Sequence, residues 1–268
     1  MKSDYVDMDS NNLKFSKSPV NEKEKLLDRA IWVTWYDLPV VGRDHYLAWL
    51  HDLHIPRMLR KPGFLWAAHY VSTNNFVRNP RLIYSTDSTI PAGNEYILIF
   101  GAQDAHVLAN PVPSKLCASI SEDDREMLSR RSGERTQVFT EVARVDGPQV
   151  GSRENERVLS PCIQIGCYNA TTSEGEEGIL DWYANCRFPA IKTLPGSVGA
   201  RRYVSVLGWG KHCVLYEFVS LEMRNEYYHS HVNSNAQMKD WGQRMLSKLI
   251  HLPKTPNVAC RIWPAISR

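Results

Sequence analysis

The chain lacks the motifs that mark several common enzyme classes. No G-x-G-x-x-G, P-loop, G-x-S-x-G or H-E-x-x-H pattern occurs in its 268 residues. Their absence argues against nucleotide-binding, serine-hydrolase and zincin functions. The six cysteines form no C-x-x-C pair, and most lie in apolar stretches. We therefore expect buried free thiols instead of a zinc site or a disulfide framework.

A strong charge of one sign and long apolar runs are also missing. The 32 basic and 29 acidic residues give a net charge of +3, which does not favour nucleic acid or an anionic membrane as a partner. No apolar run reaches the roughly 18 residues that a membrane span needs. Residues 1–29 have no apolar segment of the kind found in signal peptides, and we interpret them as a polar arm with a short helix at 21–29. The sequence thus predicts a cytoplasmic protein.

What the sequence does contain is an internal repeat. Residues 49–72 align without a gap with residues 182–205. The matches include a tryptophan, two prolines, a Pro-Gly pair and a Tyr-Val-Ser run. They are Trp49 with Trp182, Pro56 with Pro189, Pro62-Gly63 with Pro195-Gly196, and Tyr70-Val71-Ser72 with Tyr203-Val204-Ser205. A repeat of this kind predicts two copies of one supersecondary unit.

The segments around the repeat follow the same order in both halves. Each half has an alternating or β-branched run before the window, another after it, a helical stretch, and a closing strand. The strands are expected at 30–38, 95–103 and 137–145, and at 162–170, 212–220 and 257–266, with one more strand after the Pro-Gly turn of each window. This order is β-α-β-β-α-β, the ferredoxin-like motif. We predict an α+β fold with units at 30–145 and 162–268, joined by a linker at 146–161.

Each unit should have one face of its sheet bare, because both helices lie on the other face. In the strand 30–38, Ile31, Val33 and Trp35 point one way, and the opposite face is also largely apolar. We expect the two sheets to close into a pseudo-twofold α+β barrel within one chain, with homodimer formation left open. The halves differ at 73–94, a long connection expected to be an arm or lid over a pocket, or plain decoration.

Residues 44–72 resemble the EthD-like family of the dimeric α+β barrel superfamily. In that family a tryptophan-bearing helix leads into His-x-Pro and then a Pro-Gly turn, here Trp49, His54-Ile55-Pro56 and Pro62-Gly63. The second half keeps the prolines but has Arg187 in place of the histidine. The resemblance implies ligands between sheet and helices, and chemistry in the first half. Relatives include cofactor-free monooxygenases, lactone isomerases, polyketide cyclases and dehydratases, and some haem enzymes.

His54 is the main catalytic candidate, with His51 and Asp52 beside it. An imidazole that points between helix and sheet suits general acid–base catalysis near neutral pH. The alternative is a core histidine held by a hydrogen bond. Asp52 lies off the apolar stripe of the helix, which favours solvent exposure. His51 and His54 have a spacing compatible with a metal, but no second ligand cluster is visible, so no metal is predicted.

Five further residues are candidates for substrate binding: Trp35, Tyr46, Trp66, His69 and His106. Aromatic residues suit a flat apolar ligand, although core packing also explains them. His69 matches Arg202 in the second half, which favours an exposed or interface pair, with a pocket role as the alternative. His106 lies beside Asp104, for which turn chemistry is sufficient.

These observations predict a cofactor-independent enzyme that acts on a small apolar, aromatic or polyketide-like compound. His54 would transfer a proton in an isomerase, dehydratase or oxygenase reaction. One alternative, implied by the resemblance, is a haem enzyme whose axial ligand comes from the second half, at His229 or His231; a solvated histidine pair near a loop is the simpler reading there. The other alternative is a protein that binds a small molecule without catalysis.

Overall fold

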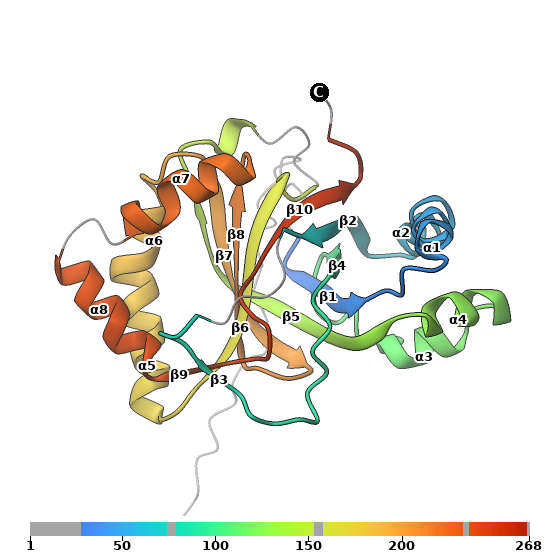
Figure 1. The fold of residues 1–268 in the computed structure, drawn as a ribbon, viewed down its shortest axis with the longest axis horizontal. Coiled ribbons are helices and arrows are strands. Elements are labelled where there is room, and N and C mark those ends of the chain that lie inside the picture. Colours follow the sequence, from blue (N-terminus) through green and yellow to red (C-terminus); the bar gives the residue numbers. More distant parts are fainter. Residues whose placement is uncertain (1–27, 74–78, 153–157, 233–235, 267–268) are drawn as a thin grey trace, which may run out of the picture.

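The computed structural model describes residues 28–73, 79–152, 158–232 and 236–266 (Figure 1). Nearly all of the predicted polar arm, including most of its predicted helix, lies outside these residues. None of the helices in the described segments is long and apolar enough to cross a membrane.

Both halves form the predicted elements in the predicted order. In the first half these are β1 (Ala30–Asp37), α1 (Arg43–Trp49), a π-helical turn (Leu50–His54), α2 (Ile55–Leu59), β2 (Phe64–Ser72), β3 (Ile83–Tyr84), β4 (Tyr96–Ala102), α3 (Pro113–Ala118), α4 (Glu122–Ser129) and β5 (Ser132–Asp146). A short 3-10 turn (Val150–Ser152) follows. In the second half they are β6 (Cys162–Ala170), α5 (Ser173–Trp182), a π-helical turn (Tyr183–Arg187), α6 (Phe188–Ile191), β7 (Ser197–Leu207), β8 (His212–Phe218), α7 (Leu221–Val232), α8 (Ala236–Leu246), β9 (Leu249–His251) and β10 (Asn257–Trp263).

The strands of the two halves close into one barrel. Each half has the ferredoxin-like strand order, β2-β4-β1-β5 and β7-β8-β6-β10. The last strand of each half pairs with the second strand of the other, β5 with β7 and β10 with β2. The predicted fold is therefore confirmed: the chain is an α+β protein whose two units form an eight-stranded antiparallel barrel.

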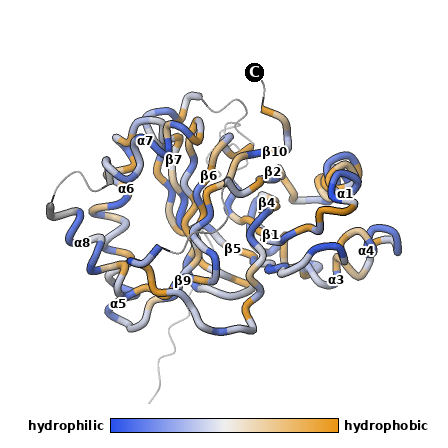
Figure 2. The backbone as a smooth tube through the Cα atoms, in the orientation of Figure 1, coloured by the Kyte–Doolittle hydropathy of each residue, from blue (hydrophilic) through white to orange (hydrophobic). Residues whose placement is uncertain are grey.

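Three apolar clusters fill the molecule, one inside the barrel and one beneath each layer of helices. Along β1, successive side chains belong alternately to the cluster inside the barrel and to the cluster under the helices of the first half. Ile31, Val33 and Trp35 point into the barrel, whereas Trp32 and Tyr36 pack against the helices of the first half. Figure 2 shows apolar stretches along the central strands and mainly hydrophilic residues along α8. Both faces of each sheet are thus buried, as the sequence predicts.

A π-helical turn interrupts the first helix of each half at the same repeat position. The N–H of Ile55 bonds to the carbonyl of Leu50, and the N–H of Phe188 bonds to that of Tyr183. These five-residue hydrogen bonds define a π turn and bring residues five apart into line. His54 therefore lies over Trp49, with ring centroids 4.9 Å apart. The sequence did not reveal this turn.

The long connection of the first half crosses to the second half. Its strand β3 pairs in parallel with β9, through Ile83 with Ile250 and Tyr84 with His251. In Figure 1 these two strands lie beside α5, far from α1 and α2. This strand therefore extends the sheet of the second half at its β9 edge. The connection then returns to the first half, where Ile90 joins the cluster inside the barrel and the Gly93 N–H bonds to the Gly133 carbonyl. Residues 74–78 of it lie outside the described residues.

Candidate functional site

A cavity of about 590 Å³ lies between the sheet and the helices of the first half. We call it the first cavity. Its floor is the outer face of β1, β4 and β5, and its walls come from α2, α3 and α4. The rim includes Gly208 and Trp209 of the β7–β8 turn in the second half. Most lining side chains are apolar, among them Trp32, Met58, Leu98, Phe100, Leu116 and Leu128.

His54 is the titratable imidazole in this cavity. It is 8% exposed, and its ring packs on Trp49. In the part of the chain that the structure describes, neither imidazole nitrogen has a hydrogen-bond partner. Burial, followed by the charge of Arg131, lowers the pKa of His54 from 6.5 to about 4. The side chain is therefore neutral at pH 7 and able to accept a proton.

A buried carboxylate fixes the platform under His54. The Trp49 Nε1 atom donates to Asp124 Oδ1 at 2.8 Å, and Arg57 Nη1 lies 2.7 Å from Asp124 Oδ2. Asp124 stands in the first turn of α4, where Ser121 accepts a hydrogen bond from its backbone N–H at 3.1 Å. This network ties α1 to α4, so that the histidine and the cavity wall keep one arrangement.

Arg131 supplies a fixed positive charge beside His54. Its Nε donates to the Tyr46 hydroxyl at 2.6 Å, and its guanidinium lies 4.5 Å from the centre of the Tyr36 ring. Its Nη1 lies 3.5 Å from Glu134, and the side chain is 6% exposed. Its Nη2 atom is buried without a hydrogen-bond partner among the described residues. A buried donor of this kind can take an acceptor atom from a ligand.

The floor of the cavity also carries hydroxyl groups. Trp32 Nε1 donates to Thr34 Oγ1 at 3.0 Å, and Thr34 Oγ1 lies 3.2 Å from Thr136 Oγ1. All three residues line the cavity. The hydroxyls give the apolar floor a place to orient a polar group of a ligand.

A neutral base and a fixed cation in an apolar cavity suit one kind of chemistry. His54 can take a proton from a carbon next to a carbonyl group, and the oxyanion that forms can lie against Arg131. A base with a pKa of about 4 is weak. The developing anion offsets the charge of Arg131, which removes one of the causes that lower the histidine's pKa. His54 therefore becomes a stronger base as the anion forms beside Arg131, and Arg131 in turn stabilises that anion.

His51 and His69 lie outside this cavity. The His51 Nε2 atom is 2.8 Å from His69 Nδ1, and His69 Nε2 is 2.8 Å from the Tyr36 hydroxyl. His69 is fully buried, and Arg202 is 6% exposed. Of the predicted exposed or interface pair, the exposed form is wrong, because helices cover the outer face of β2 and β7. Each residue does lie on a strand that joins the two halves, since β2 pairs with β10 and β7 pairs with β5.

The remaining predicted residues do not gather at the cavity. Asp52 and His106 are exposed, and the backbone N–H of His106 bonds to Asp104 in a turn. Trp35 and Trp66 point into the barrel, on the opposite face of the sheet. Tyr46 is buried behind the guanidinium that it binds. Of the eight predicted site residues, only His54 lines the cavity directly.

Sequence reasoning missed Arg131, Trp32 and Thr34. Strand alternation places Trp32 and Thr34 together on one face of β1, but both faces are largely apolar in the sequence, so the pattern did not show which face borders the helices. Arg131 had no signal in the sequence, since it follows α4 far along the chain. The helix α3, which builds one wall, was not predicted. His229 and His231 lie in the last turn of α7, a helix that the sequence analysis did not predict.

No protein-family model matches the sequence, and no curated protein matches it either. Solved structures do match. One is an anthrone oxidase-like protein with 6% identity, covering 88% of this chain and 92% of that one, at a TM-score of 0.58. A "putative monooxygenase" from Fusobacterium nucleatum subsp. nucleatum ATCC 25586 has 9% identity, covers 87% and 90%, and has a TM-score of 0.53. Another, from Lactobacillus acidophilus NCFM, has 9% identity, covers 88% and 94%, and has a TM-score of 0.50.

At these identities the likeness shows the fold alone. The match over most of each chain shows that these proteins share the α+β barrel fold described above. The narrower resemblance to the EthD-like family stays a prediction. Among the haem candidates, His231 Nε2 lies 3.0 Å from Thr193 Oγ1 and 3.1 Å from the Ala190 carbonyl, so it is held within the protein. His229 lines a second cavity, in the other half.

Proposed function

We propose that the chain is a cofactor-independent oxygenase for a small aromatic compound with an acidic C–H group. One observation carries the proposal: His54 is a buried neutral imidazole without a hydrogen-bond partner in the described residues, and it faces a largely apolar cavity. Arg131 stands beside it with an unused donor. Solved neighbours that are named as monooxygenases and as anthrone oxidase-like share the fold, which favours an oxidative reaction.

The proposed reaction converts a CH₂ group next to a carbonyl into a ketone. His54 accepts one proton, and Arg131 stabilises the resulting enolate through its oxygen. The carbanion then transfers electrons to molecular oxygen and forms a C–O bond. His54 returns its proton to the peroxide and forms a hydroperoxide. The O–O bond then breaks, and the departing hydroxide combines with the second hydrogen of the CH₂ group, lost as a proton, to form water. The sum is CH₂ + O₂ → C=O + H₂O.

The same two groups would also serve an isomerase or a dehydratase, since both begin with removal of a proton beside a carbonyl. These reactions consume no oxygen. Oxygen uptake with a stoichiometry of one per substrate therefore separates the proposed reaction from these alternatives.

The test uses anthrone as the probe, with oxygen uptake and product formation measured in parallel. We expect His54→Gln to lower kcat/KM by about 10²- to 10⁴-fold, the usual contribution of a general base. Arg131→Met should lower it by about 10²-fold or more, as loss of an oxyanion donor does. His45 is exposed on the same helix, so His45→Gln is the matched control, and the exposed Arg60 provides Arg60→Met.

Unchanged turnover in a folded His54→Gln protein would contradict the proposal. If the protein exchanges the acidic protons of the probe for deuterium but consumes no oxygen, the chemistry is proton transfer alone. The haem alternative has its own readout, a Soret band after addition of haemin that persists through gel filtration and is lost in His229→Ala.

A further inference from the structure

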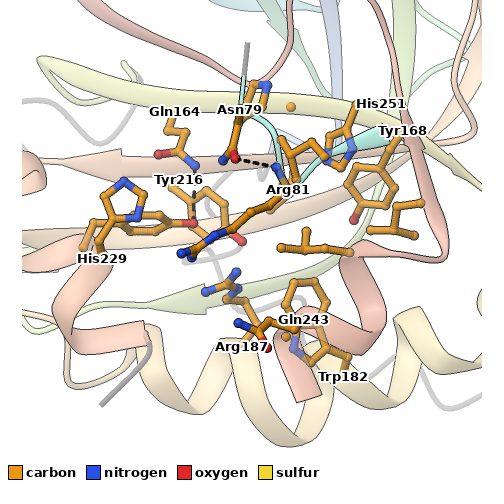
Figure 3. Close-up of a pocket in the computed structure, with 18 of the residues that line it drawn as sticks. Asn79, Arg81, Gln164, Tyr168, Trp182, Arg187, Tyr216, His229, Gln243 and His251 are labelled. Carbon is orange, nitrogen blue, oxygen red and sulfur yellow. Dashed lines mark hydrogen bonds between the residues drawn. The ribbon is translucent and has the colours of Figure 1, made fainter. Parts of the chain in front are cut away.

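The second cavity, of about 550 Å³, lies under the helices of the second half. The outer face of β6 and β8 forms its floor, and α5, α7 and α8 form its walls. Asn79, Arg81 and Leu82, from the long connection of the first half, cover one side (Figure 3). This cavity has the same place in its half as the first cavity has in the other. The side chains that line the two cavities are different.

Positive charge dominates the lining. Arg81, Arg187, Arg224 and Lys239 line the second cavity, and no aspartate or glutamate is among its described lining residues. These charges act on His229, which also lines the cavity. Burial, and then the charges of Arg224, Arg187 and Arg81, lower its pKa. A cavity with this lining attracts a negatively charged ligand.

Arg187 stands at the centre of this arrangement. Its guanidinium lies 4.6 Å from the Trp182 ring and 5.9 Å from the Tyr228 ring. The residue is half-buried, and its Nε atom is buried without a hydrogen-bond partner in the described part of the chain. Figure 3 shows the guanidinium groups of Arg187 and Arg81 directed toward the same part of the cavity. Two planar groups that converge in this way suit one carboxylate.

Arg224, the third arginine of the lining, is hydrogen-bonded to uncharged side chains, so these partners do not offset its positive charge. The Arg224 Nη2 and Nε atoms donate to Gln164 Oε1 at 2.6 and 3.1 Å, and its Nη1 donates to Asn225 Oδ1 at 2.9 Å. Gln164 in turn donates to the Tyr228 hydroxyl at 3.3 Å. An amide fixes the position of a guanidinium and leaves its field in the cavity.

The walls are aromatic. Trp182, Tyr183, Tyr216 and Tyr228 pack edge to face around the cavity, with ring centroids 5.1 to 5.5 Å apart in the pairs Trp182–Tyr183 and Tyr216–Tyr228. Flat faces of this kind stack on the body of an aromatic ligand. The phenol hydroxyls of Tyr168 and Tyr183, 3.1 Å apart, add polar points along one wall.

We infer that the second cavity is a binding site for a small aromatic carboxylic acid, whose carboxylate lies between Arg187 and Arg81 and whose ring stacks among the tyrosines. The site is separate from the first cavity and its proposed reaction. A ligand anion would offset a cluster of cations that the described lining leaves without a carboxylate, and binding would therefore stabilise the fold.

The test is calorimetric titration of the whole chain with 2-naphthoate, compared with 2-naphthamide, a neutral molecule of nearly the same shape. We expect the acid to bind at least tenfold more tightly than the amide, and its affinity to fall as sodium chloride rises. Arg187→Gln should weaken the acid at least tenfold and leave the amide within threefold. Arg81 is exposed, so Arg81→Gln should fold normally, and it should weaken the acid several-fold.

Two controls separate the cavities. Arg244 is exposed on α8 and pairs with Asp240 at 3.2 Å outside the lining, so Arg244→Gln should bind naphthoate like the natural chain. His54→Gln should also bind it unchanged. Equal affinity for acid and amide, or full binding by both Arg187→Gln and Arg81→Gln, overturns the inference. Loss of binding in His54→Gln would place the acid in the first cavity and would overturn the inference. Displacement of naphthoate by haemin, if it depends on His229, would assign the second cavity to haem and would overturn the inference as well.

Discussion

The two halves of this protein build their cavities on one frame and fill them differently. In each half a helix, a π turn and a second helix lead from a tryptophan to a residue stacked on it, His54 over Trp49 and Arg187 over Trp182. The first cavity is apolar with a neutral base, and the second is aromatic with a cluster of cations. The comparison teaches that the fold fixes where a side chain stands, while the residue at that place differs in charge between the halves: a neutral imidazole in the first cavity and one of four cations in the second.

The sharpest way to break the comparison is to exchange the two residues. His54→Arg removes the base and adds a second cation beside Arg131, so turnover of the anthrone probe should fall by at least about 10²-fold. Arg187→His should leave turnover within about threefold. Steady-state kinetics on both variants, with thermal melts to confirm folding, checks this. Comparable losses in the two variants would mean that the halves share one function.

Acidification should weaken both halves through buried histidines. Burial lowers the pKa of His54 and of His251, one in each half, to about 4. The unfolded state therefore binds more protons between pH 6.5 and pH 4, and stability falls as the pH falls through that window. Each histidine should account for about 3 kcal/mol of the loss. Urea unfolding at pH 7 and pH 4 measures it.

His54→Gln should remove that share of the pH dependence, and the exposed His45→Gln should remove none. An unchanged difference between pH 7 and pH 4 in His54→Gln would show that this imidazole is solvated instead of buried.

The anchors of the two tryptophans should differ in strength. Asp124→Ala takes the acceptor from Trp49 Nε1 and the partner from Arg57, which should lower the free energy of unfolding by about 2 kcal/mol. Arg187→Gln removes a cation that lies over the rings of Trp182 and Tyr228 and should cost less than about 1 kcal/mol. Chemical unfolding compares the two. A larger loss in Arg187→Gln would identify that arginine as a structural residue.

The smallest effect is expected at the rim of the first cavity. Trp209, which is 38% exposed, belongs to the β7–β8 turn of the second half. Trp209→Ala removes apolar contact area from the mouth of the cavity and touches no proposed catalytic group. KM for the probe should rise several-fold with kcat unchanged. A fall in kcat alone would show that the turn acts in the chemical step.

The sequence predicted the architecture well and the site poorly, for different physical reasons. Matched residues such as Pro56 and Pro189 report local chain geometry, and strand alternation follows from a period of two, so the repeat and the barrel could be inferred. Arg131 reaches Tyr46 from a distant segment, and Trp49 meets Asp124 in the same way. Such contacts depend on packing that no local pattern encodes. Trp35 was assigned to the ligand because alternation separates two faces without saying which one borders a cavity.

Each cavity is bordered in part by residues of the other half, and the pairing of β3 with β9 is one cause of this arrangement. Residues from the first half border the second cavity, and the β7–β8 turn of the second half borders the first. A chain cut at the junction would yield two fragments, each with a chamber missing part of its border. Changes in the length of one connection can therefore retune ligand choice in the opposite half, while the residues that bind the ligand there stay the same.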